Sequence, residues 1–111
     1  MVYTYVMSTG VYLYNIFLIF ALKEDVASLF ARGLSFYNAK NYADAVAIWT
    51  RAASRGHVRA QHGLGKCCEK GWGLPQDYGQ AVSWYRRAAD QGHAAAQNNL
   101  GLCYKKGWGS S

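Results

Sequence analysis

The sequence predicts an all-α protein, a solenoid of stacked helix pairs. The first observation is a duplication: the stretches 42–73 and 78–109 align without a gap at an offset of 36 residues, and 17 of the 32 aligned positions are identical. A fixed period of this size is typical of a helical repeat array. The second observation is that apolar and small residues recur within each copy three or four positions apart, the spacing of one helix face. Contacts between neighbouring units can hold such an array together without a single globular core.

The first two helices are expected over residues 26–37 and 42–55. Acidic residues stand just before the first helix, where they suit the positive end of its dipole. A short polar break, 38–41, separates the helices, and Asn41 is placed to cap the second one. Each helix carries one stripe for burial, made of Leu29, Gly33 and Phe36 on the first and Ala45, Trp49, Ala52 and Ala53 on the second.

The third helix is expected over residues 58–70, after a turn at Gly56. Glycine can adopt the positive φ at which helices often end. His57 follows this glycine, and His93 occupies the same place one repeat later, so we expect both histidines to be turn residues and not ligands. Gly65 is expected to mark a helix crossing. The buried face of this helix is predicted to hold Ala60, Leu64 and Cys67 or Cys68.

A loop with two glycines and a proline, 71–76, ends the third helix, and Asp77 is placed to cap the fourth. The fourth and fifth helices are expected over 78–91 and 94–106. Trp72 and Trp108 recur in equivalent loops, and we expect each to fold over the next helix pair instead of contacting a ligand such as a carbohydrate. The stripe predicted for burial on the fourth helix is Ala81, Tyr85, Ala88 and Ala89.

The two ends of the chain leave alternatives open. Residues 2–22 carry no charge and are long enough to cross a bilayer, so a membrane anchor or signal, a helix packed on the repeats, and an unstructured or wrongly chosen start all stay open. Localisation, either cytoplasmic or membrane-associated in the cell envelope, depends on residues 1–22. The fifth helix presents an apolar side to a helix that does not follow, so we expect a fragment, or cover by the N-terminal segment, a second copy or a partner. That side consists of Leu100, Cys103 and Tyr104.

The charge and the cysteine content of the sequence limit the classes of partner and ligand that we expect. Twelve Lys and Arg against six Asp and Glu give a net charge of +6, which favours acidic partners. Motif spacings typical of nucleic-acid binding are absent from the sequence, so we predict no nucleic-acid partner. The three cysteines lack the C-x2-C spacing of a zinc site, and adjacent helical cysteines are poor disulfide partners. We therefore expect no cofactor, no metal and no disulfide framework.

The spacing of small and aromatic residues along the chain resembles that of the Sel-one-like repeat, a branch of the tetratricopeptide superfamily. The resemblance covers about residues 26–109, and the first unit, 23–56, is nearer to the plainer 34-residue tetratricopeptide spacing. It divides the chain into an apolar segment 1–22, a tetratricopeptide-like pair 23–56, a Sel-one-like repeat 57–92 and the first helix of an incomplete repeat 93–111. The pattern is Ala60-x3-Leu64-Gly65-x2-Cys68-x2-Gly71-x-Gly73-x3-Asp77-x3-Ala81-x3-Tyr85-x2-Ala88-Ala89-x2-Gly92.

The resemblance implies a right-handed α/α superhelix that acts as an adaptor or scaffold for protein partners. In such arrays the first helix of each pair lines the concave face. Several basic residues there would favour an acidic peptide, and the alternative is a solvated basic face without a ligand. The residues placed on that face by register are Phe30, Tyr37, Arg59, His62, Lys66, Glu69, Lys70, Asn98, Lys105 and Lys106.

Catalysis is the competing class of function. Cysteine-rich secreted members of the resembling family have been ascribed β-lactamase-type hydrolase activity, and they carry a cysteine pair in each repeat. This chain lacks such pairs, and it also lacks S-x-x-K, G-x-S-x-G and H-E-x-x-H motifs. We therefore expect a binding protein and no enzyme.

Overall fold

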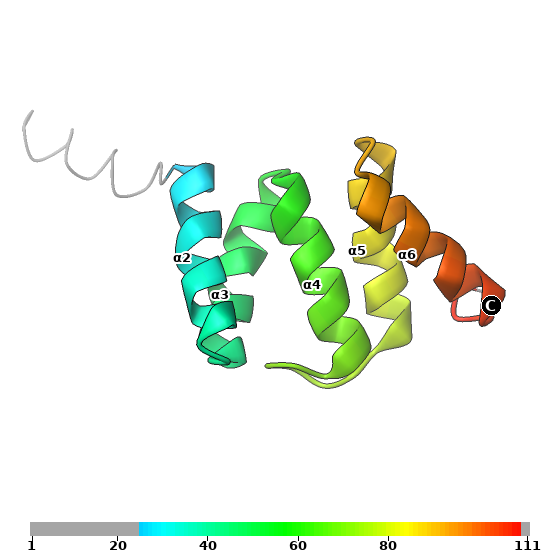
Figure 1. Cartoon of the computed structure of the whole chain (residues 1–111), viewed down its shortest axis with the longest axis horizontal. Helices are drawn as coiled ribbons and strands as arrows, with labels where there is room; N and C mark the ends of the chain where they lie inside the picture. Colours follow the sequence, from blue (N-terminus) through cyan, green and yellow to red (C-terminus); the bar gives the residue numbers. More distant parts are fainter. Residues whose placement is uncertain (1–24, 110–111) are drawn as a thin grey trace, which may run out of the picture.

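The computed structural model describes residues 25–109, which form five α-helices. Each helix packs against the one before it and the one after it, so that α3 lies between α2 and α4, and α5 between α4 and α6 (Figure 1). This arrangement is the predicted all-α right-handed α/α superhelix. Predictions for residues 1–22 fall outside the described residues. The helices are α2 (Val26–Asn38), α3 (Tyr42–Ser54), α4 (Val58–Lys70), α5 (Tyr78–Asp90) and α6 (Ala94–Lys105).

Helix starts are fixed by side chains that accept backbone N–H groups. Asp77 accepts from the N–H of Gln80, as the sequence predicts, and Asp25, expected only to suit the helix dipole, accepts from the N–H of Ala27. The histidines expected only as turn residues also cap helices. His57 Nδ1 accepts from the Ala60 N–H at 3.2 Å, and His93 accepts from the equivalent N–H of Ala96 at 3.3 Å.

Asn41 departs from its predicted role. It stands at the N-cap position of α3, but its side chain makes no capping hydrogen bond. Instead the Asn41 amide donates to the Asp44 carboxylate at 2.7 Å. The bond to the charged carboxylate is stronger than the neutral bond in which Asn41 Oδ1 would accept a backbone N–H, and a negative charge in the first turn suits the helix dipole.

Helices approach one another where a large ring meets a glycine. Trp49 of α3 is 3% exposed and lies against both Gly33 of α2 and Gly63 of α4. One repeat later, Tyr85 of α5 lies against Gly65, where an added Cβ would come within 2.5 Å of the ring. The predicted helix crossing at Gly65 is therefore confirmed.

Polar groups hold both rings in place. The Trp49 indole N–H donates to the backbone carbonyl of Phe30 at 3.1 Å. The Tyr85 hydroxyl donates to the Glu69 carboxylate at 2.7 Å, and burial raises the pKa of Tyr85 well above its usual range, with help from Glu69. Buried polar groups that are paired in this way fix the orientation of each ring.

The predicted buried stripes are confirmed except at Phe36 and Ala89, which are only half-buried. Ala45, Ala52 and Ala53 on α3 are buried, whereas Ala89 of α5 is only half-buried. Ala53 touches α4 within the cluster around Trp49. Ala89 stays half-buried although the Gln97 side chain of α6 donates to its backbone carbonyl at 3.2 Å.

The recurring tryptophans pack, but against the preceding helix pair and not the next one. Trp72 stacks on Tyr42 at 5.0 Å between ring centroids, and Trp108 stacks on Tyr78 at 3.8 Å. Each loop therefore turns back on the start of the previous helix. The reason is that a positive φ at Gly71 and at Gly107 reverses the chain at the end of α4 and α6.

The apolar side of α6 is partly covered within the described residues. Cys103 is buried in a cluster with residues of α4 and α5, and Leu100 packs on that cluster. Tyr104 is 44% exposed and Leu102 is 46% exposed.

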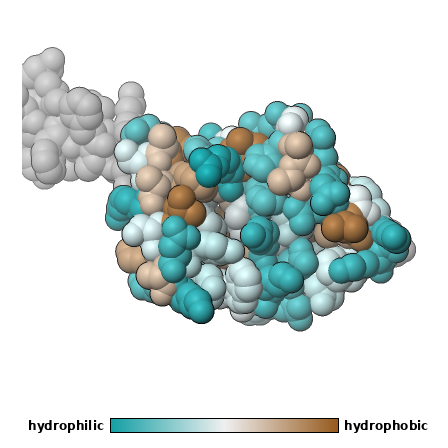
Figure 2. All heavy atoms as spheres, in the orientation of Figure 1, coloured by the Kyte–Doolittle hydropathy of each residue, from teal (hydrophilic) through white to brown (hydrophobic). Residues whose placement is uncertain are grey.

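Figure 2 shows that the face drawn in Figure 1 is mostly hydrophilic, with small separate hydrophobic spots. Within residues 25–109 no helix has the length and apolar character needed to span a bilayer.

Two equivalent glycines give a matched test of the ring–glycine contact. We predict that Gly65→Ala destabilises the fold by about 1–3 kcal/mol, because the new methyl group would overlap the Tyr85 ring. Gly101→Ala, one repeat later, meets nothing within 4 Å and should stabilise α6 by about 0.5–1 kcal/mol. Urea unfolding of the full chain, followed by circular dichroism, measures both. Equal effects of the two substitutions would contradict the contact.

Candidate functional site

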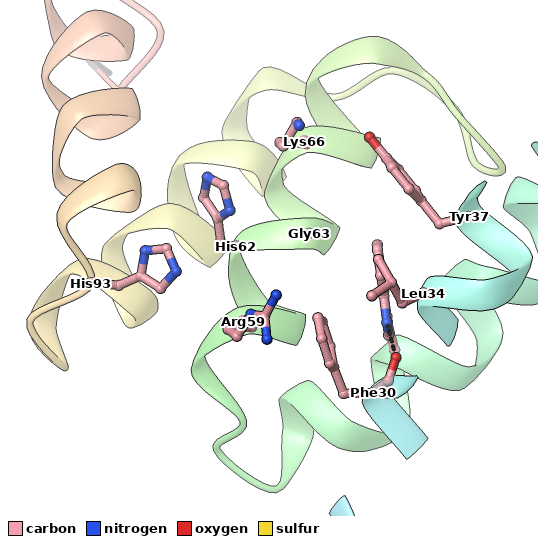
Figure 3. A pocket seen from close by; sticks show the side chains of 9 residues that line it. Phe30, Leu34, Tyr37, Arg59, His62, Gly63, Lys66 and His93 are labelled. Carbon is pink, nitrogen blue, oxygen red and sulfur yellow. Dashed lines mark hydrogen bonds between the residues drawn. The ribbon is translucent and has the colours of Figure 1, made fainter. Parts of the chain in front are cut away.

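A pocket of about 220 Å³ lies between α2 and α4, the first helices of two successive pairs. Side chains from α2 and α4 point toward each other across it (Figure 3), and Trp49 of α3 also lines it. The start of α6 adds one histidine. The lining residues are Phe30, Leu34, Tyr37, Trp49, Arg59, His62, Gly63, Lys66 and His93.

Two cation–aromatic pairs span the groove, one on each side of the pocket. The Arg59 guanidinium lies 4.6 Å from the centre of the Phe30 ring, and the Lys66 ammonium lies 5.9 Å from that of Tyr37. Phe30 and Tyr37 are seven residues apart on α2, as are Arg59 and Lys66 on α4. Seven residues are two helical turns, so both pairs face the same groove.

The pocket opens between these pairs because one position lacks a side chain. Leu34 of α2 and Gly63 of α4 line the middle of the groove (Figure 3). Glycine is required at position 63, since an added Cβ would come within 2.6 Å of the Trp49 ring. The Trp49 ring fills the place where this Cβ would lie, so the ring itself lines the pocket beside Gly63.

The groove between α4 and α6 is built on the same plan with different side chains. Phe30 stacks on His57 at 4.8 Å, and in the next unit His62 stacks on His93 at the same distance. By this register Asn99 of α6 is the counterpart of Gly63, and its amide oxygen lies 2.9 Å from His62 Nε2. A hydrogen bond thus closes the second groove where the first has a pocket.

The pocket is electropositive. Within the described residues Arg59 and Lys66 contact aromatic rings, and neither forms an ion pair with a carboxylate. The nearest acidic group on α4, Glu69, accepts the Tyr85 hydroxyl and lies 3.9 Å from the Lys70 ammonium. Burial, with the charges of His93 and Lys66, lowers the pKa of His62 despite its bond to Asn99. The charge available to a ligand therefore comes from Arg59 and Lys66.

Half of the residues predicted on the concave face meet in this pocket: Phe30, Tyr37, Arg59, His62 and Lys66. Glu69 and Lys70 lie further along α4. Asn98, Lys105 and Lys106 are exposed on α6 or at its end, where Lys106 covers the Trp108 ring at 4.7 Å. Sequence reasoning missed Leu34, Trp49, Gly63 and His93 in the pocket, and it missed Asn99 in the second groove. The signal for Asn99 was the alignment of the copies, in which a glycine changes to a polar residue at this one position of α4 and α6.

Stacked helix pairs and a groove between their first helices define this chain as a helical-repeat protein. A comparison with protein families agrees: the model for the Sel1 repeat matches residues 26–57, 58–93 and 94–111. The chain therefore belongs to the Sel1 repeat family, whose members are generally protein-interaction modules. The match includes 26–57, the unit whose spacing is nearer to the tetratricopeptide pattern.

Two solved structures are similar over 82% of this chain, each with 33% identity. One is a protective antigen from uropathogenic Escherichia coli strains with an SLR fold, at a TM-score of 0.76. The other is a Sel1 repeat protein from Oxalobacter formigenes, at a TM-score of 0.75. The match spans 20% of the first of these chains and 39% of the second. A search of curated proteins found no significant match.

The lowered pKa of His62 makes stability depend on pH. Below the ordinary pKa of 6.5 the unfolded chain takes up a proton that the folded chain resists, so stability falls as the pH drops from about 6.5 toward the lowered value. We predict that His62→Gln, which keeps a donor for Asn99, reduces this loss between pH 7.5 and pH 5.5. Urea unfolding at both pH values measures it. His57 has a lowered pKa for a similar reason, so part of the loss should remain. An unchanged pH dependence would contradict the role of His62.

Proposed function

We propose that this chain is an adaptor that binds an acidic segment of a partner protein in the groove between α2 and α4. One observation carries the proposal: Arg59 and Lys66 are held on opposite sides of an apolar pocket, without carboxylate partners among the described residues. Membership in a family of protein-interaction repeats supports the same class of function. The mostly hydrophilic face in Figure 2 favours recognition by charge and one pocket over a broad apolar interface.

The free energies of the two kinds of contact favour replacing each cation–π contact with a hydrogen bond from the cation to a carboxylate of the ligand. A cation–π contact at an exposed site contributes about 0.5–1 kcal/mol. A hydrogen bond to a charged group contributes about 1.5–3 kcal/mol. An incoming carboxylate can therefore draw Arg59 or Lys66 away from its ring at small cost. In the chain without ligand the rings already hold both cations in the groove, so the Arg59 and Lys66 side chains lose less conformational freedom on binding.

The cysteines support binding over catalysis. Burial raises the pKa of Cys67 to about 11, and it also raises the pKa of Cys68 and Cys103. Nucleophilic thiol chemistry needs the thiolate, which is scarce at neutral pH for such groups. Attachment to a membrane through residues 2–22 and self-association through the exposed side of α6 remain separate predictions.

Charge reversal in the groove tests the proposal. A phage-displayed peptide library is selected on the full chain, and dissociation constants of the selected peptides are measured by fluorescence polarisation. We predict that the selected peptides are rich in Asp and Glu. Arg59→Glu/Lys66→Glu should weaken their binding at least about 100-fold, because two charge-assisted contacts of about 1.5 kcal/mol or more are lost.

The matched control is Lys105→Glu/Lys106→Glu, which changes the net charge by the same amount on α6, away from the pocket. Binding by this variant should stay within about threefold of the native chain, since screening in 0.15 M salt acts over about 8 Å. An equal loss in both variants would show that overall charge and not the groove attracts the peptides. Retention of binding by Arg59→Glu/Lys66→Glu would overturn the proposal.

A further inference from the structure

We infer that the groove between α2 and α4 recognises an extended segment with acidic residues at its first and fifth positions and a large apolar residue at its third. This inference rests on the proposed function and goes further, since it names the spacing and the central side chain of the ligand. It follows from the order of three features along the groove: a cation, an apolar pocket and a second cation.

The two cations set the length of the ligand. Arg59 and Lys66 are seven residues apart, which is about 10.5 Å along α4. In an extended segment alternate side chains point to one face, and positions one and five are about 13 Å apart. The flexible Arg and Lys side chains can cover the difference of about 3 Å. Positions one, three and five then face the groove together.

The middle of the groove sets the central side chain. Leu34 and Trp49 offer apolar surface there, and Gly63 adds no side chain that would fill the space. A pocket of about 220 Å³ has room for one leucine-sized or aromatic side chain. Leu34, Trp49 and Gly63 offer no free side-chain hydrogen-bonding group to a polar side chain at this position, because the indole N–H already donates to the Phe30 carbonyl.

The neighbouring groove explains why the segment is expected at one place only within the described residues. By register Ala95 and Leu102 of α6 replace Arg59 and Lys66, and Asn99 occupies the gap. The α6 side of the groove between α4 and α6 therefore carries neither cation, and Asn99 stands where the first groove is open. An acidic segment with an apolar centre is complementary to the first groove in charge and shape, and to the second in neither.

The experiment compares peptides of equal charge on the full-length chain by fluorescence polarisation. The reference peptide is a ten-residue Gly/Ser peptide with Asp-x-Leu-x-Asp at its centre. One comparison peptide has the same composition with the two Asp adjacent, and another has Ser in place of Leu. The last is an alanine-based helical peptide with Asp at positions i and i+7 and Leu at i+4. We expect the reference peptide to bind at least tenfold more tightly than each of the others.

Variants of the chain locate the apolar contact. Leu34→Trp should fill the pocket and reduce the preference for Leu over Ser to less than twofold. The control Leu102→Trp, on the exposed side of α6, should leave that preference unchanged. A preference that survives Leu34→Trp would place the apolar contact elsewhere and overturn the inference.

The outcomes separate this inference from the proposed function. Equal binding of all four peptides, lost in Arg59→Glu/Lys66→Glu, would keep the basic groove as the site for acidic ligands and overturn the spacing. Tightest binding of the helical peptide would likewise overturn the extended ligand. Failure of every acidic peptide, while library-selected neutral peptides bind, would overturn the proposed function itself.

Discussion

Close contact between one large aromatic ring and a glycine determines how these helices stack. Trp49 lies against Gly33 and Gly63, and Tyr85 lies against Gly65, with no room for a Cβ at any of the three positions. Each ring is also held by a hydrogen bond, from Trp49 to a backbone carbonyl and from Tyr85 to a carboxylate. The spacing of α2, α3, α4 and α5 follows from these contacts, because a buried ring fills a fixed volume and interiors pack without gaps.

The same contact creates the candidate site. Gly63 permits α4 to approach Trp49, and both residues line the pocket between α2 and α4. At the equivalent position of α6, Asn99 bonds to His62 and the space is closed. A residue needed for packing in one repeat thus gives that repeat a binding pocket as a direct consequence.

Helix positions could be predicted from the sequence to within one residue, because the repeat supplies two aligned copies of each capping and turn signal. Asp77 and Gly56 each act locally, and their roles followed from neighbouring residues alone. The cap at Asn41 was predicted wrongly, since the Asn41 side chain donates to the ionised Asp44 carboxylate three residues away instead of accepting a backbone N–H. The direction of Trp72 also escaped prediction, because it depends on where the loop places the ring relative to Tyr42.

The candidate site was predicted less completely, since register gives the face of a residue and not the depth of the surface around it. Register placed Arg59, Lys66, Phe30 and Tyr37 on one face, and the structure brings them together. It could not show that Lys105 lies away from them, nor that a glycine would define the pocket. A missing side chain leaves no positive signal in a single sequence, and its effect appears only when the opposite helix is in place.

Each repeat contains two sets of positions with different roles, one for packing and one for ligand recognition. The rings and the glycines beneath them specify how units stack, whereas the outer groove positions of α4 and α6 (59 and 66 in one unit, 95 and 102 in the next) specify what each groove accepts. Exposed positions can change without disturbing the buried rings, since most surface substitutions alter stability very little. In such an array the ligand of one groove can change while the stacking of the helices and the other grooves stay the same.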